Sequence, residues 1–181
     1  MQWRNSTERY GLVAIGLHWL VALTVFAMFS LGLWMTSLDY YHPWYHRAPA
    51  LHKSIGVVLF ALVVVRLLWR WFNRQPTPLP SHTRFERMAA RWVHALLYLL
   101  LFAVMVAGYL ISTADGRPIE VFGLLSIPAT ITSIPNQEDV AGDIHLLLAI
   151  TLITLALLHA AAALKHHFVD RDNTLRRMLG R

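Results

Sequence analysis

Long apolar stretches alternate with shorter polar and charged connections along this chain. Four of the apolar stretches are poor in charge and long enough to cross a membrane: residues 11–35, 51–72, 92–111 and 144–164. A helix needs about 20 apolar residues to span the hydrocarbon core of a bilayer, so each stretch is predicted to be a membrane-spanning helix. The first apolar run is too long for a cleaved signal peptide, and no small-residue cleavage site follows it. The pattern predicts an all-α, integral membrane four-helix bundle forming a single domain over residues 1–181.

Composition agrees with this pattern and excludes several classes of chemistry. Hydrophobic residues make up 56% of the chain, charged residues only 14%, and the mean hydropathy is +0.47. These values argue against a disordered chain and against an ordinary soluble domain. The absence of cysteine excludes disulfides, zinc–thiolate sites, iron–sulfur clusters and cysteine nucleophiles. The net charge of +6 is better explained by basic residues that flank membrane spans than by a nucleic-acid partner. We therefore expect no binding of nucleic acid.

The distribution of Lys and Arg predicts the orientation in the membrane. The two tails and the connection between the second and third spans, with their flanks, hold 13 of these residues, and the other two connections hold 3. Cytoplasmic segments are enriched in Lys and Arg, so both termini are predicted to lie in the cytoplasm. Residues 36–50 and 112–143 then form outer loops. The basic C-terminal tail is expected to lie on anionic membrane lipid.

Five histidines lie inside the predicted spans: His18, His52, His94, His145 and His159. An ionisable side chain in a membrane span is costly and usually marks a functional site. His145 and His159 are 14 residues apart, which places both on one face of the fourth helix at depths that differ by about 21 Å. The fourth span therefore offers an imidazole at each of two levels.

Matching depths across the helices pairs His52 with His145 at the outer level and His18 with His159 at the inner level. Two facing imidazoles at each level suit two six-coordinate haem b groups, with His52 and His145 on the outer iron and His18 and His159 on the inner iron. Small residues leave room for a porphyrin, as at Gly56.

Other interpretations stay open at several of these positions. Histidines in a haem-free structural protein form hydrogen bonds between helices, and a bundle of histidines also binds zinc or copper. These metals usually add carboxylate or thiolate ligands, which the spans lack. His94 is either an alternative inner ligand, part of a substrate pocket or a residue of a helix contact. Arg66 either meets a haem propionate or extends to the membrane surface.

Four stretches spread over the whole chain carry a family resemblance: GLHWLVAL (16–23), LHKSIGVVLFALVVVRLLWR (51–70), HALLYLLLFAVMVAGY (94–109) and HAAAALKHHFVDRDNTLRRM (159–178). In them the chain resembles the bacterial cytochrome b561 family of di-haem, four-helix membrane cytochromes. It is also similar to the cytochrome b subunits of membrane formate dehydrogenases and hydrogenases. The ERYG start and the YLISTADG stretch are closer to another branch of the family than to the superoxide oxidase branch.

The resemblance implies the same two ligand pairs, a location in the bacterial inner membrane and electron transfer between a donor and a quinone. In the superoxide-oxidising branch the quinone site lies near the cytoplasmic haem. The matching positions are Arg84 and His166, with His94 nearby, and a proton for quinone reduction is assigned to His94 or His166. The alternative is that Arg84 and His166 are interfacial residues beside lipid headgroups.

The predicted function is relay of electrons from an outer-side donor to the quinone pool through two haem b groups. Two alternatives remain: a superoxide oxidase, and a cytochrome b subunit that serves a periplasmic redox protein. The outer side carries a net charge of −3, which disfavours steering of superoxide, although Arg47 and Lys53 lie near His52. Whether the protein is an enzyme or only a carrier stays open. The loop 112–143 is predicted to form a short interfacial helix or to cover the outer haem.

Overall fold

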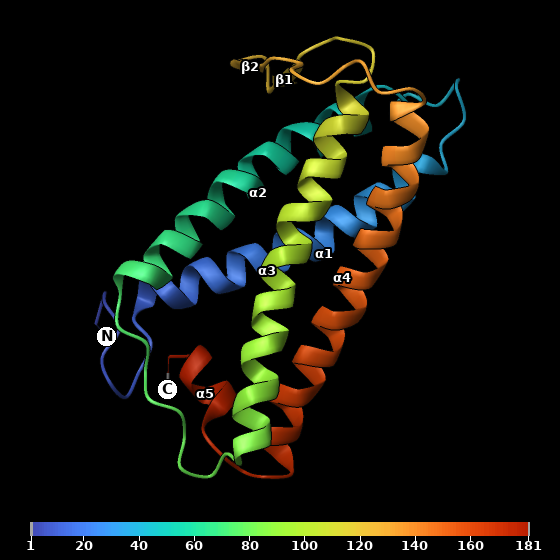
Figure 1. The fold of residues 1–181 in the computed structure, drawn as a ribbon. Helices are drawn as coiled ribbons and strands as arrows, with labels where there is room; N and C mark the ends of the chain where they lie inside the picture. The colour runs from blue at the N-terminus through green and yellow to red at the C-terminus, as the bar shows by residue number, and fades with distance from the viewer. Residues whose placement is uncertain (1, 181) are drawn as a thin grey trace. The chain divides into compact units, whose positions relative to one another are not determined.

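Four long helices make up most of the chain in the computed structural model, which describes residues 2–180 (Figure 1). The elements are α1 (Leu12–Thr36), α2 (Arg47–Phe72), α3 (Arg84–Ser112), β1 (Ile119–Val121), β2 (Leu125–Ile127), α4 (Gln137–Phe168) and α5 (Thr174–Met178). Helices α1 to α4 are each long and apolar enough to cross a membrane. This confirms the predicted all-α membrane fold with four spans.

Two helices begin well before the predicted spans, and hydrogen bonds made by side chains at the first turns stabilise both starts. At α3, Thr83 N–H donates to Glu86 Oε2 (2.8 Å) and Glu86 N–H donates to Thr83 Oγ1 (3.2 Å), which is a capping box. At α4, the side-chain amide of Gln137 donates to the carbonyls of Leu110 and Ile131 (2.9 and 2.8 Å). These first turns are polar, so a search for apolar runs does not detect them.

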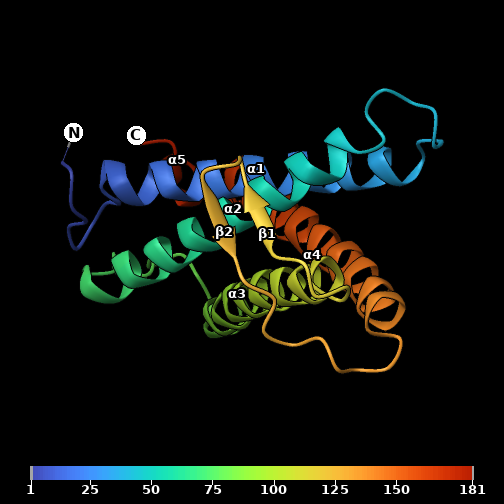
Figure 2. The ribbon, with the colours of Figure 1, turned by 90° about the horizontal axis from the view of Figure 1, so that it is seen from above.

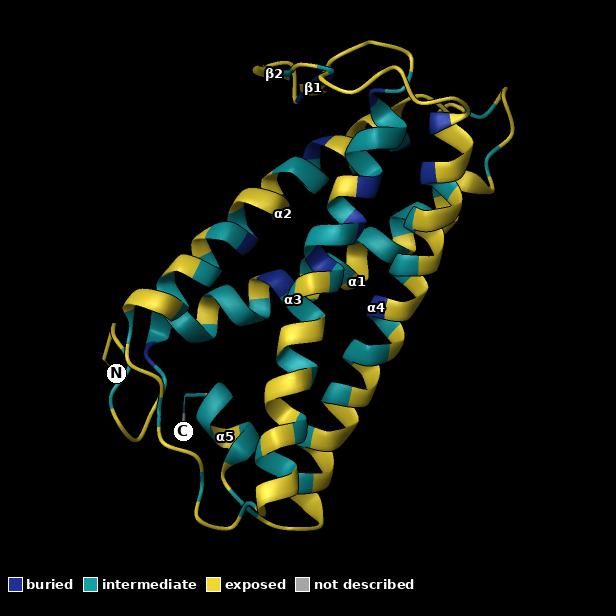
Figure 3. Cartoon of the chain, in the orientation of Figure 1, coloured by how far each residue is buried: buried dark blue, intermediate teal, exposed yellow. Residues whose placement is uncertain are grey.

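The long helices expose apolar side chains on most of their surface. Only Val21 is buried in α1, while Leu23 is 66% exposed. Figure 3 shows that few residues of the other long helices are buried, because exposed and intermediate residues far outnumber them. A helix that is apolar all round is stable when lipid covers it, because exposing these side chains to water is unfavourable. The exposure pattern therefore agrees with a lipid environment.

The chain divides into two compact units. The terminal unit consists of Met1–Ala22, Leu62–Leu99 and Thr154–Arg181, and the hairpin unit consists of Leu23–Ala61 and Leu100–Ile153. His18, His94 and His159 fall in the terminal unit, whereas His52 and His145 fall in the hairpin unit. Each pair expected from helix depth thus lies within a single unit. The organisation as one domain stays a prediction.

A short antiparallel hairpin, β1–β2, occupies part of the predicted outer loop (Figure 2). Phe122 and Gly123, both with positive φ, make the turn. Buried Ser54 of α2 fastens the hairpin: its hydroxyl donates to the Glu120 carbonyl (3.2 Å) and accepts from the Phe122 N–H (3.1 Å). The expectation of a short helix in this loop is wrong, because β-branched residues beside a glycine turn pair as strands. The expectation that the loop covers a haem stays a prediction.

Candidate functional site

The hairpin unit brings the rings of His52 of α2 and His145 of α4 close together, in an edge-on arrangement. Their ring centres lie 6.3 Å apart and their planes are inclined by 70°. Nδ1 of His145 lies 2.8 Å from the Val104 carbonyl oxygen. A carbonyl only accepts hydrogen bonds, so Nδ1 carries the proton and the neutral ring keeps its lone pair on Nε2. A histidine that binds a metal through Nε2 is usually held in this way.

Two glycines lie directly beside this histidine pair, where a larger residue would press on the rings. A Cβ on Gly32 of α1 would lie 3.4 Å from Cε1 of His52, and a Cβ on Gly108 of α3 would lie 3.1 Å from Cε1 of His145. Gly56, the glycine singled out in the sequence, has only an ordinary contact with Met28. Nδ1 of His52 is buried and has no hydrogen-bond partner among the described residues. The backbone of α1 and α3 thus approaches both rings closely.

The terminal unit gathers a different set of side chains. Arg66 Nη2 lies 2.8 Å from Nδ1 of His18, and the guanidinium also lies 5.5 Å from the centre of the Tyr98 ring. A guanidinium only donates, so Nδ1 of His18 is the acceptor and its proton sits on Nε2. The rings of His94 and His159 contact each other, with centres 5.1 Å apart. His94, left open in the sequence, is therefore a direct neighbour of His159.

The three residues expected at a quinone site lie in different surroundings. Arg84 lines a groove of about 570 Å³ on α3, His94 packs on His159, and His166 faces the carboxylates of Asp170 and Asp172. No hydrogen bond or ion pair links the three within residues 2–180. The quinone site stays a prediction.

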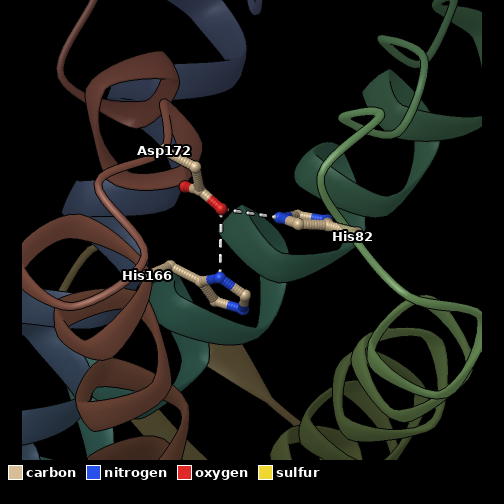
Figure 4. A group of neighbouring side chains, drawn as sticks. All are labelled: His82, His166 and Asp172. Carbon is tan, nitrogen blue, oxygen red and sulfur yellow. Dashed lines mark hydrogen bonds and ion pairs between the residues drawn. The ribbon is translucent and has the colours of Figure 1, made fainter.

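A cluster that the sequence did not reveal lies near His166. Oδ2 of Asp172 is 3.0 Å from Nδ1 of His166 and 3.1 Å from Nε2 of His82 (Figure 4). Burial raises the pKa of the Asp172 carboxyl, but hydrogen bonds from Thr174 and His82 outweigh it, so the pKa lies below its ordinary value. An Asx turn at Asp172 and Thr174 is detectable in the sequence. The contact with His82, 90 residues away, is not.

These observations define a class: a multi-pass membrane protein that holds facing histidines between its spanning helices. The chain matches the family described as prokaryotic cytochrome b561 over residues 9–181, and it belongs to that family. It is therefore a bacterial membrane electron-transfer protein, and the family implies b-type haem.

Three relatives cover nearly the whole chain. "Cytochrome b561 homolog 2" of Escherichia coli (strain K12) is 52% identical over 181 residues, which are 100% of this chain and 96% of the relative. "Probable superoxide oxidase CybB" of Yersinia pestis is 34% identical and covers 95% of this chain and 96% of its own. "Cytochrome b561 homolog 1" of Escherichia coli (strain K12) is 28% identical, with 96% and 98% covered.

The histidine pair of the hairpin unit fits a haem iron. An iron bonded at about 2 Å to the facing nitrogen of each ring would hold the ring centres roughly 6 Å apart, and His52 and His145 are 6.3 Å apart. The lone pair on Nε2 of His145 is available for such a bond. In the terminal unit His94 and His159 are too close for an iron between them, and His18 carries its proton on Nε2. That unit fits the group only after Arg66 leaves His18.

Proposed function

We propose that the protein relays electrons between a donor on the outer side of the membrane and a quinone on the cytoplasmic side, using two haem b groups. His52 and His145 would hold one group, and His18 and His159 the other. When bound, haem b supplies reversible one-electron redox chemistry. Both termini would lie in the cytoplasm, as the distribution of basic residues predicts.

The spacing of His52 and His145, with the hydrogen bond from His145 to Val104, carries this proposal. The hydrogen bond fixes both the tautomer and the orientation of the ring, so the protein prepares Nε2 as a ligand before any iron arrives. Gly108 leaves space for the ring in that orientation. A hydrogen bond that only joins two helices would account for this tautomer, but it does not require the ring of His52 at 6.3 Å.

On the quinone side, His94 is the residue to which we assign proton transfer. It contacts the ring of His159, so it lies beside the proposed ligand and within the same unit. An imidazole both accepts and donates a proton, which suits reversible proton exchange with a quinone. Nδ1 of His166 already faces two carboxylates, and Arg84 lines a separate groove, where it offers a positive charge to an approaching head group.

Stopped-flow mixing of the purified, oxidised haem protein with a short-chain ubiquinol tests the proposal. In wild type, the quinol is expected to reduce the haems, and the b-type absorption of the reduced form is expected to appear within the time of the mixing experiment. His94→Ala is expected to slow this reaction at least tenfold while both haem spectra persist. Unchanged quinol kinetics in His94→Ala would remove His94 from the role. Failure of wild type to react with quinol or with quinone would overturn the quinone link.

A second candidate function is oxidation of superoxide, favoured by the 34% identical relative that is named a probable superoxide oxidase. The same stopped-flow protein, mixed with a superoxide solution and with superoxide dismutase as the control, separates the two donors. Rapid haem reduction that dismutase abolishes would identify superoxide as the donor. The third possibility, a periplasmic redox partner, predicts instead that a periplasmic protein co-purifies and reduces the haems.

A further inference from the structure

Three side chains converge outside the proposed haem sites. His82 lies between α2 and α3, His166 lies in the last turn of α4, and Asp172 lies between α4 and α5. Figure 4 shows both imidazoles directed at one carboxylate oxygen of Asp172, at 3.1 and 3.0 Å. Their side chains are only 17%, 15% and 7% exposed, respectively. We call these three residues the His–Asp cluster.

Hydrogen bonding does not account for the geometry at His166. Its Nδ1 lies 2.9 Å from Asp170 Oδ2 and 3.0 Å from Asp172 Oδ2, yet the directions of approach do not meet the geometry of a hydrogen bond. Neither oxygen is placed to accept a hydrogen bond from this nitrogen. Two ligand atoms of one first-row cation, each about 2.1 Å from the metal, lie roughly 3 Å apart when the angle between them at the metal is near 90°. The contacts therefore resemble those of a metal chelate.

The surrounding hydrogen bonds hold the ligand atoms in place. Thr174 N–H donates to Oδ1 of Asp172 (2.8 Å), which leaves Oδ2 directed at the histidines. Asp172 N–H donates to the His166 carbonyl (3.1 Å), and Arg171 between the two elements has a left-handed φ of 55°. The side chain of Arg87 donates twice to the His82 carbonyl (3.0 and 2.7 Å). Such outer contacts are the usual support of metal ligands.

A neighbouring group of acidic residues is less suited to a cation. Glu86, His166 and Asp170 also lie close enough to share an ion. However, Lys165 Nζ already lies 2.7 Å from Asp170 and 3.5 Å from Glu86, so a cation would have to displace the ammonium group. No lysine or arginine forms an ion pair with Asp172 in the described residues. The available charge is therefore at Asp172.

We propose that the His–Asp cluster binds one divalent first-row cation through Nε2 of His82, Nδ1 of His166 and Oδ2 of Asp172. Two imidazoles and one carboxylate are a common donor set for such metals. The ion would join the α2–α3 connection and the segment before α5 to the end of α4. The helix α5 that follows this segment is already held at two points: Trp19 Nε1 donates to the Met178 carbonyl (2.7 Å), and Arg177 Nη1 donates to the Thr77 carbonyl (2.8 Å).

Zinc is the probe that tests this site. The haem-loaded full chain, purified without a polyhistidine tag and stripped with EDTA, is titrated with Zn²⁺ by calorimetry, and bound metal is counted after equilibrium dialysis. Wild type is expected to bind one Zn²⁺ per chain. His82→Ala and Asp172→Asn are each expected to weaken binding at least tenfold. His167→Ala, which changes the adjacent histidine outside the cluster, is the matched control and is expected to bind as wild type does.

Haem absorption is recorded for every variant, so a folding defect is separated from a loss of ligand. As a second measurement on wild type alone, Zn²⁺ is expected to slow proteolysis of residues 169–180. The proposal is overturned if wild type binds no stoichiometric zinc, or if His82→Ala and Asp172→Asn bind it as tightly as wild type. Equal loss in His167→Ala would also contradict it. None of these outcomes changes the haem spectra, so the test is independent of the proposed electron transfer.

Discussion

The histidines of the two units differ in which ring nitrogen carries the proton. In the hairpin unit, His145 donates its Nδ1 proton to the Val104 carbonyl, and the ring of His52 lies 6.3 Å away. In the terminal unit, His18 accepts a hydrogen bond at Nδ1 from Arg66, and His94 and His159 lie in contact at 5.1 Å. The proton is therefore on Nδ1 in one proposed ligand and on Nε2 in the other.

This difference shows that pairing two histidines by their depth in the membrane does not by itself make two equivalent metal sites. The residue that hydrogen-bonds the second ring nitrogen sets the tautomer, and only a ring with its lone pair on Nε2 is ready for an iron at that atom. The hairpin unit holds His145 in the tautomer that a haem iron would require. To hold the haem proposed at His18 and His159, the terminal unit would have to move Arg66 away from His18 and separate His94 from His159. Arg66 is then free to pair with an anionic group such as a propionate.

Replacing one proposed haem ligand in each unit has the largest expected effect. His145→Ala and His159→Ala are each expected to lower the haem content from two per chain to one, because six-coordinate binding loses an axial ligand. The pyridine haemochrome assay measures the ratio, and the α-band shows which component is lost. His46→Ala, at an exposed position, is the control. Retention of both chromophores in either ligand variant would refute the ligand assignment.

Crowding His145 has the next largest expected effect. In Gly108→Ala the new Cβ would lie 3.1 Å from Cε1 of His145, so the ring has to shift by a few tenths of an ångström. Overpacking of this kind costs about 1–3 kcal/mol, so haem affinity in the hairpin unit is expected to fall roughly tenfold. Haem transfer to apomyoglobin measures the loss. Gly142→Ala, on α4 of the same unit with open space around it, is the matched control and should change nothing.

Removing the charge of Arg66 tests the terminal unit. Arg66→Gln is expected to lower the midpoint potential of the haem proposed at His18 and His159 by several tens of millivolts, because a nearby positive charge disfavours the oxidised iron. Spectroelectrochemical titration resolves the two potentials. The exposed Arg74→Gln serves as the control. A shift confined to the other haem would contradict the placement of Arg66 beside His18.

His94→Ala is expected to have the smallest effect on haem content. If His18 and His159 are the ligands, this variant keeps two haems per chain, and loss of the packed ring changes the potential by only a small amount. The haemochrome ratio and the same titration provide the measurement. Loss of one haem would show that His94, rather than His18, completes the pair with His159.

The sequence alone predicted the four spans, the family and the pairing of histidines by depth. The length of an apolar run and the periodicity of a helix are local properties, so they can be recognised in the sequence without knowledge of the fold. The same method missed the polar first turn of α4, since Gln137 finds its partners at Leu110 and Ile131. It also missed the hairpin in residues 112–143, which depends on Ser54 of another helix.

The amino-acid sequence determined which residue types lie at each membrane level, because rise and rotation per residue are constant along a helix. Only the tertiary structure decided which ring nitrogen carries the proton, since Val104 and Arg66 come from different helices than the histidines they contact. It alone brought His82 and Asp172 to His166. Hydrogen-bond direction depends on where separate segments meet, and spacing along the chain does not encode that.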